Sequence, residues 1–163
     1  MRPPGTRAVV SVTVALALAG LASGCGGGSD RLDAAELISR GDELCREGQE
    51  RFAQLQQGEI VNAKAAVQQT DELVSVATDE LNELRALRPP EDLRDPYDSY
   101  LAARASALEL LEEGRDAAAE RNASGYAKAQ AELAAGVKER ERLARAVGFE
   151  VCSQADADAD ARQ

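Results

Sequence analysis

Apolar residues recur every three, four or seven positions through four consecutive segments of this 163-residue chain, a spacing that places them on one face of a helix. Helix-ending residues separate the segments, namely Gly58, Pro89-Pro90 and Asn122. Four helices joined by short connections predict an all-α fold, an antiparallel up-down-up-down four-helix bundle over residues 30–152. The predicted helices run over about residues 30–57, 62–87, 95–122 and 124–147.

Capping residues mark where these helices begin and end. Ser29 or Asp30 is a candidate N-cap for the first helix, and Asp95 followed by Pro96 for the third. Gly148 is expected to end the fourth helix, because glycine readily adopts the backbone conformation found there. We expect residues 149–152 to follow as a short extended segment.

The first helix divides into an apolar and a charged side. Asp42 and Arg46 lie four residues apart on the charged side, which predicts an exposed ion pair. Charged residues such as Glu80 and Arg140 interrupt the apolar seam of the later helices, so a long coiled-coil rod is second choice to the bundle. The apolar side of the first helix is predicted to comprise Leu32, Ala35, Ile38, Cys45, Phe52 and Leu55.

Residues 1–24 have the organisation of a secretory signal peptide. Arg2 and Arg7 give a positive start, and a mainly apolar run follows from Ala8 to Leu21. This run is too short to cross a hydrocarbon core of about 30 Å comfortably. We therefore expect residues 1–24 to be removed when the protein is exported.

The residues Leu21-Ala22-Ser23-Gly24-Cys25 resemble the lipobox of bacterial lipoproteins, although that family usually has Leu where Ala22 stands. The resemblance implies cleavage before Cys25 and acylation of its thiol, which would anchor the protein to a membrane. Residues 26–29 are Gly-rich and uncharged, so residues 25–29 predict a flexible tether. The alternative is an ordinary signal peptide and a soluble secreted protein, because Ala22 and Gly24 also fit that cleavage rule.

The chain has three cysteines, an odd number that needs explaining in an exported protein. The lipobox accounts for Cys25. The remaining two, Cys45 and Cys152, are then expected to form a disulfide in an oxidising compartment. The alternative is a pair of buried free thiols that act as small apolar side chains.

Composition excludes several classes of function. The absence of histidine excludes His-dependent catalysis, His-ligated zinc and His-ligated haem. An aromatic content of 3% and a net charge of −10 argue against nucleic acid as a partner. We expect no cofactor.

Acidic residues give two weak candidates for a cation site. Residues 156–160 alternate Asp with Ala, like the first residues of a calcium-binding loop. The Gly and Glu that such a loop has at later positions are missing. A disordered acidic tail over residues 153–163 is therefore expected. Glu72, Asp79 and Glu109 are loose candidates for a carboxylate site between helices, with exposed helix positions as the simpler interpretation.

Tyr97 and Tyr100 lie near the start of the third helix. One interpretation is an exposed recognition surface. The commoner arrangement for such residues closes the end of a core and leaves the hydroxyl groups in water.

A resemblance to small actinobacterial lipoproteins, mostly of unknown function, extends over nearly the whole chain. It implies export, a helical body and the Cys45–Cys152 pair, and it carries over no catalytic residue. The residues that carry it are Leu87-Arg88-Pro89-Pro90, then Leu93, Tyr97 and Leu101, and the ending Val147-Gly148-Phe149-Glu150-Val151-Cys152.

The sequence therefore predicts an exported protein held by Cys25 at the outer face of the plasma membrane. It would act without catalysis, through contact with an envelope protein or a ligand. The alternative is a small lipoprotein that binds a solute or cation in an acidic pocket between helices. An enzyme is the third hypothesis.

Overall fold

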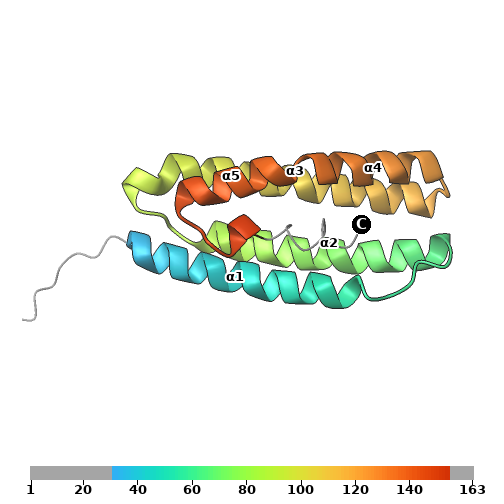
Figure 1. Ribbon diagram of the computed structural model, residues 1–163, viewed down its shortest axis with the longest axis horizontal. Coiled ribbons are helices and arrows are strands. Elements are labelled where there is room, and N and C mark those ends of the chain that lie inside the picture. Colours follow the sequence, from blue (N-terminus) through green and yellow to red (C-terminus); the bar gives the residue numbers. More distant parts are fainter. Residues whose placement is uncertain (1–30, 155–163) are drawn as a thin grey trace, which may run out of the picture.

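The computed structural model describes residues 31–154, and the elements within this range are helical, with no strand. This confirms the all-α prediction. Figure 1 shows long helical segments packed side by side, the last of them divided in two. The helices are α1 (Ala34–Leu55), α2 (Ala63–Ala86), α3 (Arg94–Ala119), α4 (Ala123–Ala135) and α5 (Val137–Val147), with short 3₁₀ turns η1 (Glu91–Leu93) and η2 (Cys152–Gln154).

Several predictions fall outside the described residues. They are the signal peptide over 1–24, the tether over 25–29 with its anchor Cys25, and the acidic run over 156–160. Within residues 31–154, the helices are too short or too polar to span a bilayer.

Helix α1 starts later than predicted, because Asp33 is its N-cap in place of Ser29 or Asp30. The Asp33 carboxylate accepts a hydrogen bond from the backbone N–H of Glu36 at 2.8 Å. Glu36 adds negative charge to the first turn, where the helix dipole favours it. Asn62 caps α2 in the same way, close to the predicted start of that helix.

Helix α3 begins one residue before Asp95, which therefore lies in the first turn and not at the cap. The reason is that η1 leads directly into α3. The backbone N–H of Leu93 bonds to the carbonyl of Pro90, and the N–H of Arg94 bonds to the carbonyl of Glu91. The first residues of α3 therefore continue a turn that has already formed. Pro96 lies in the first turn, as predicted.

The predicted single helix over 124–147 is interrupted at Gly136, between α4 and α5. The Arg140 side chain donates a hydrogen bond to the Leu133 carbonyl at 3.1 Å. In a regular helix that carbonyl bonds to the N–H of residue 137. A Cβ atom on Gly136 would lie 2.6 Å from the Arg140 Nη1 atom, so the glycine leaves room for this guanidinium.

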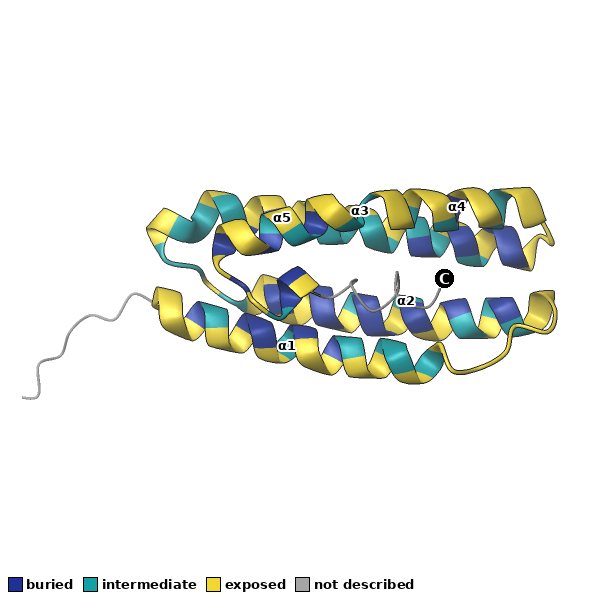
Figure 2. Cartoon of the chain, in the orientation of Figure 1, coloured by how far each residue is buried: buried dark blue, intermediate teal, exposed yellow. Residues whose placement is uncertain are grey.

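The main cluster of buried residues lies where α1, the end of α2, the start of α3 and the end of α5 meet, and Figure 2 marks the buried positions along these helices. The buried face of α1 differs from the prediction, since Ala35 is exposed and Leu37 is fully buried. Gly41 is also buried, because the ring of Phe149 occupies the space that a side chain there would need. The buried core comprises Leu37, Cys45, Leu84, Tyr97, Tyr100, Ala144, Val147, Phe149 and Cys152.

The C-terminal residues connect the last helix to the first. Gly148 ends α5 with a φ of 102°, the left-handed conformation expected at a glycine cap. The chain then turns, and Cys152 begins η2, so the expected extended segment is shorter than predicted. Element η2 contacts both α5 and α1. Because Ser153 is buried, the folded part extends past the predicted boundary at residue 152.

Candidate functional site

Cys45 and Cys152 form a disulfide, with their Sγ atoms 2.05 Å and their Cα atoms 5.2 Å apart. Both residues are buried, at 2% and 3% exposure. The hydroxyl group of Tyr100 lies 3.5 Å from the Cys45 Sγ atom. Because a disulfide sulfur carries no hydrogen, the tyrosine is the donor in that contact. The bond joins α1 to η2 across 107 residues of sequence.

Asp42 binds the same C-terminal turn without a covalent bond. Its carboxylate accepts hydrogen bonds from the backbone N–H groups of Glu150, Val151 and Cys152, at 3.0, 2.9 and 3.2 Å. The predicted Asp42–Arg46 pair is therefore wrong, because Asp42 is buried and Arg46 pairs with the exposed Glu43. A carboxylate accepting three N–H groups fixes the backbone of residues 150–152.

Tyr97 and Tyr100 form neither an exposed surface nor a water-facing pair. Each is 1% exposed, and each ring contacts Phe149 edge-on, with centroids 6.1 and 5.4 Å away. The Tyr97 hydroxyl donates to the Leu84 carbonyl at 2.5 Å. Burial, followed by the charges of Tyr100 and Asp98, raises the pKa of Tyr97 well above its ordinary value of 10.0. These tyrosines are structural.

A buried ion pair lies beside the disulfide. The Arg104 guanidinium of α3 is 2.6 Å from the Glu80 carboxylate of α2, whose side chain is 7% exposed. A Glu80 oxygen also lies 3.7 Å from the Cys45 Sγ atom. Gly48 of α1 makes room for Glu80, because a Cβ atom there would lie 2.5 Å from its Oε2 atom. The pair thus joins α2 to α3, and Glu80 also packs against α1 at Gly48.

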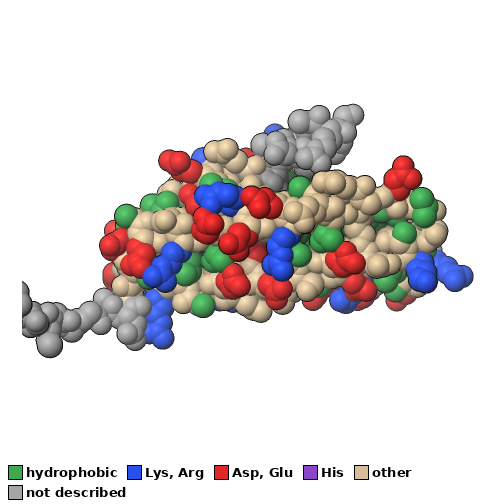
Figure 3. Space-filling view, turned by 90° about the horizontal axis from the view of Figure 1, so that it is seen from below, with side chains coloured by type: hydrophobic (Ala, Val, Ile, Leu, Met, Phe, Trp, Pro, Cys, Tyr) green, Lys and Arg blue, Asp and Glu red, His purple; other side chains and the backbone are tan. Residues whose placement is uncertain are grey.

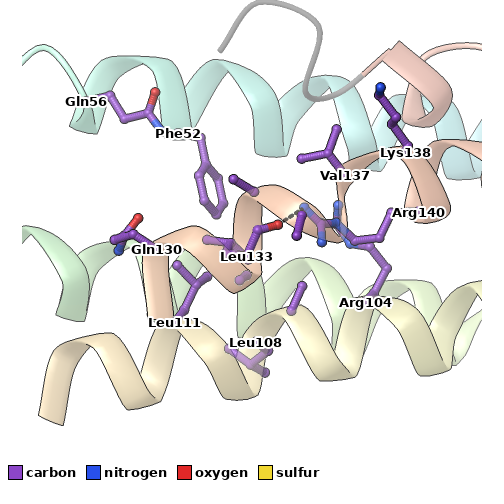
Figure 4. Close-up of a pocket in the computed structure, with 14 residues that line it drawn as sticks. Phe52, Gln56, Arg104, Leu108, Leu111, Gln130, Leu133, Val137, Lys138 and Arg140 are labelled. Carbon is purple, nitrogen blue, oxygen red and sulfur yellow. Dashed lines mark hydrogen bonds between the residues drawn. The ribbon is translucent and has the colours of Figure 1, made fainter. Parts of the chain in front are cut away.

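A cavity of about 480 Å³ lies next to this ion pair, and each of the five α-helices contributes to its walls. Its size falls in the range of about 300–1,000 Å³ that is usual for small-molecule sites. Figure 4 shows Arg104, Arg140 and Lys138 toward one end of the view and Phe52 toward the other.

The charged groups of the cavity lining are all cationic. Arg104 is held by Glu80, and the largely buried Arg140 donates to the Leu133 carbonyl. Lys138 is exposed at the start of α5. None of the fourteen lining residues in this part of the chain is Asp or Glu.

The rest of the lining is apolar or carries an amide. Leu108 and Leu111 of α3 and Leu133 of α4 form part of the wall (Figure 4). The amides of Gln56 and Gln130 lie at the end away from the arginines. The cavity therefore combines a long apolar surface with a cationic end.

The acidic pocket suggested by the sequence differs from this cavity in charge. Glu72, Asp79 and Glu109, the loose candidates for a carboxylate site, are exposed on α2 and α3. Among residues 31–154, no three Cys, Asp or Glu side chains gather as they would around a metal ion. The buried acidic residues in the described range are instead Glu80, which pairs with Arg104, and Asp42, which accepts backbone N–H groups of the C-terminal turn.

Sequence reasoning did not identify Arg104, Lys138 and Arg140 as site residues. One signal was present for Arg140, because it and Glu80 interrupt apolar seams, and both are buried in the structure. Arg104 and Lys138 gave no comparable signal. Their position beside a cavity depends on how far apart the helices pack.

In comparisons with protein-family models, with curated proteins and with solved structures, none matches this chain.

Proposed function

We propose that this chain is an exported, lipid-anchored protein of the cell envelope that acts by binding a protein or ligand, without catalysis. The disulfide between Cys45 and Cys152 is the observation that carries the proposal. Disulfides persist in oxidising compartments outside the cytosol and are rare inside it. A bond buried in the core and joining the two ends of the fold serves structure rather than redox exchange.

Cys25 is the third cysteine, and the lipobox-like sequence around it supports a role as the lipid anchor. The backbone N–H of Leu32 bonds to the carbonyl of Arg88 at 2.8 Å. The chain therefore enters the fold beside the α2–α3 connection. In the proposed arrangement the helical segments alternate in direction, up-down-up-down, and this end of the bundle lies nearest the membrane.

The cavity supports binding rather than catalysis. Its polar side chains are guanidinium, ammonium and amide groups, such as Arg140, Lys138 and Gln130. Guanidinium, ammonium and amide groups are hydrogen-bond donors, so this lining is suited to holding a ligand that carries acceptors. The surface charges are of mixed sign, as Figure 3 shows for one face, which favours a specific site over a broad charged patch.

The test is expression of the full chain in a bacterial host, followed by separation of membranes from soluble protein. The unaltered chain is expected in the membrane fraction, and Cys25→Ser is expected in the soluble exported fraction. Ser29→Ala, four residues further along, serves as the matched control and is expected to stay with the membrane. A soluble unaltered chain, or a membrane-bound Cys25→Ser variant, would overturn the lipid anchor.

A further inference from the structure

We propose that the inter-helix cavity binds a single-chain amphiphile with an anionic head group, of which an alkyl carboxylate is the simplest example. The head group lies at the end formed by Arg104, Lys138 and Arg140, and the alkyl chain extends along the apolar wall toward Phe52 (Figure 4). This inference rests on the proposed function only in treating the protein as a binder. It requires neither export nor the anchor.

Charge selects an anion over a cation. The whole chain has a net charge of −10, yet the charged residues that line this cavity are two arginines and a lysine. Glu80 neutralises part of this charge through Arg104. A cluster of cationic side chains beside an apolar wall attracts anions, because charges interact more strongly next to the low-dielectric protein interior than in bulk water.

Guanidinium geometry selects a carboxylate or a similar planar or tetrahedral oxyanion. Each guanidinium has five N–H donors in one plane, so it can serve more than one acceptor. Arg104 contacts Glu80 and Arg140 contacts the Leu133 carbonyl, and these bonds fix both side chains before a ligand arrives. Groups fixed in advance lose less conformational entropy on binding.

The apolar wall selects an alkyl chain over a bare anion. Phe52 and Leu111 line the cavity away from its cationic end, and Leu108 and Leu133 lie between them and the arginines (Figure 4). An ion such as acetate would occupy only the charged end and leave this wall facing water. Each methylene group that the wall buries is expected to tighten binding by up to about fourfold.

The experiment uses the full chain with Cys25→Ser, because detergent needed for a lipidated protein would compete with the ligand. Titration calorimetry at low salt measures binding of octanoate and decanoate below their micelle concentrations, with acetate and decyltrimethylammonium as comparators. Saturable 1:1 binding is expected for the alkyl carboxylates, tighter for decanoate by about tenfold. Acetate and the cationic amphiphile are expected to bind at least about tenfold more weakly than decanoate.

Matched variants locate the site. Lys138→Glu reverses a charge at the cationic end and is expected to weaken decanoate binding about fivefold. Lys128→Glu makes the same change on α4 outside the lining and is expected to have no effect. Ala134→Leu fills the cavity from an exposed lining position and is expected to abolish measurable binding. Ala131→Leu, exposed on the same helix outside the lining, is expected to leave binding intact.

Absence of saturable decanoate binding, equal binding of the cationic amphiphile, or equal effects of the variants and their controls would each overturn the proposal. Thermal melting of every variant tests whether it is folded, so that a loss of binding is read only from folded protein. A chain that associates with membranes but binds no decanoate would contradict this inference alone. A chain that binds decanoate but never reaches a membrane would contradict only the lipid anchor.

Discussion

The carboxylate of Asp42 accepts a hydrogen bond from the backbone N–H of Cys152 at 3.2 Å, although the two residues are 110 positions apart in the sequence. Cys45, three residues after Asp42, is bonded covalently to the same Cys152. One turn of α1 thus holds the C-terminal turn twice, once by charge-assisted hydrogen bonds and once by a disulfide. The two attachments together fix the last element of the fold on the first.

Replacement of Asp42 by asparagine is expected to lower the free energy of unfolding by about 2 kcal/mol. An amide has one oxygen where the carboxylate has two. Its NH₂ group would face a backbone N–H and cannot accept the hydrogen bond that the second carboxylate oxygen now accepts. Urea unfolding of the oxidised chain measures the change. Asp79→Asn, at an exposed position of α2, is the control and is expected to alter the free energy by less than about 0.5 kcal/mol. Equal losses in the two variants would contradict the role of Asp42.

Reduction of the Cys45–Cys152 bond is expected to lower the free energy of unfolding by about 2–5 kcal/mol. The bond closes a loop of 107 residues, and release of a long loop gives the unfolded chain much entropy. Urea unfolding with and without reductant measures the loss. The double variant Cys45→Ser, Cys152→Ser controls for other effects of the reductant and is expected to show no response to it. An unaltered chain that is equally stable in reductant would contradict the prediction.

Replacement of either of two buried glycines by alanine is expected to change the stability of the fold, in opposite directions at the two positions. At Gly41 a Cβ atom would overlap the ring of the buried Phe149, so Gly41→Ala is expected to destabilise the fold by about 1–3 kcal/mol. At Gly114 in α3 the nearest atoms are 3.6 Å from such a Cβ, an ordinary contact. Gly114→Ala is expected to stabilise by up to about 1 kcal/mol through helix propensity. Thermal melting compares the two, and a stabilised Gly41→Ala variant would contradict the packing against Phe149.

Tyr97 is expected to make the fold sensitive to alkaline pH. The folded state keeps its hydroxyl protonated to a higher pH than the unfolded chain does, because burial raises the Tyr97 pKa. The resulting stability is complete below about pH 10 and is lost as the pH rises toward the folded-state pKa. As the pH rises above about 10, the Tyr97→Phe variant is expected to lose less stability than the unaltered chain does.

The same variant is expected to cost about 1 kcal/mol at neutral pH, because it removes the hydrogen bond to the Leu84 carbonyl. That carbonyl also accepts the backbone N–H of Leu87, so it keeps a partner. Urea unfolding at several pH values measures both effects. Tyr126→Phe in α4 retains Tyr97 and is expected to show the full alkaline loss. A Tyr97→Phe variant with an unchanged pH profile would contradict the prediction.

Local sequence signals predicted the helices well where they act within one turn. Pro89-Pro90 ends the segment containing α2, Asn62 caps its start and Gly148 ends α5, as expected from their intrinsic backbone preferences. The start of α1 was predicted less well, because several adjacent residues are able to cap a helix. The correct cap, Asp33, is followed three residues later by Glu36, whereas Asp30 is followed at that distance by Asp33, and the capping box favours Glu or Gln there.

The buried face of α1 and the cavity depend on residues distant in sequence, and a periodic pattern does not contain that information. Gly41 and Asp42 are not apolar, so hydrophobic spacing placed neither of them inside. Phe149 fills the space beside Gly41. The backbone N–H groups of residues 150–152 offset the free-energy cost of burying the Asp42 carboxylate. Lys138 and Arg104 line a cavity only because of how the helices around them are spaced.

The state of the three sulfur atoms in protein extracted from membranes of its own host tests the account most directly. The chain is denatured without reductant, treated with a maleimide and analysed by mass spectrometry. We predict that residues 1–24 are absent, that Cys25 carries an acyl group, and that neither Cys45 nor Cys152 reacts, because the two are bonded to each other. A chain with three reactive thiols and an intact N-terminus would contradict both export and the lipid anchor.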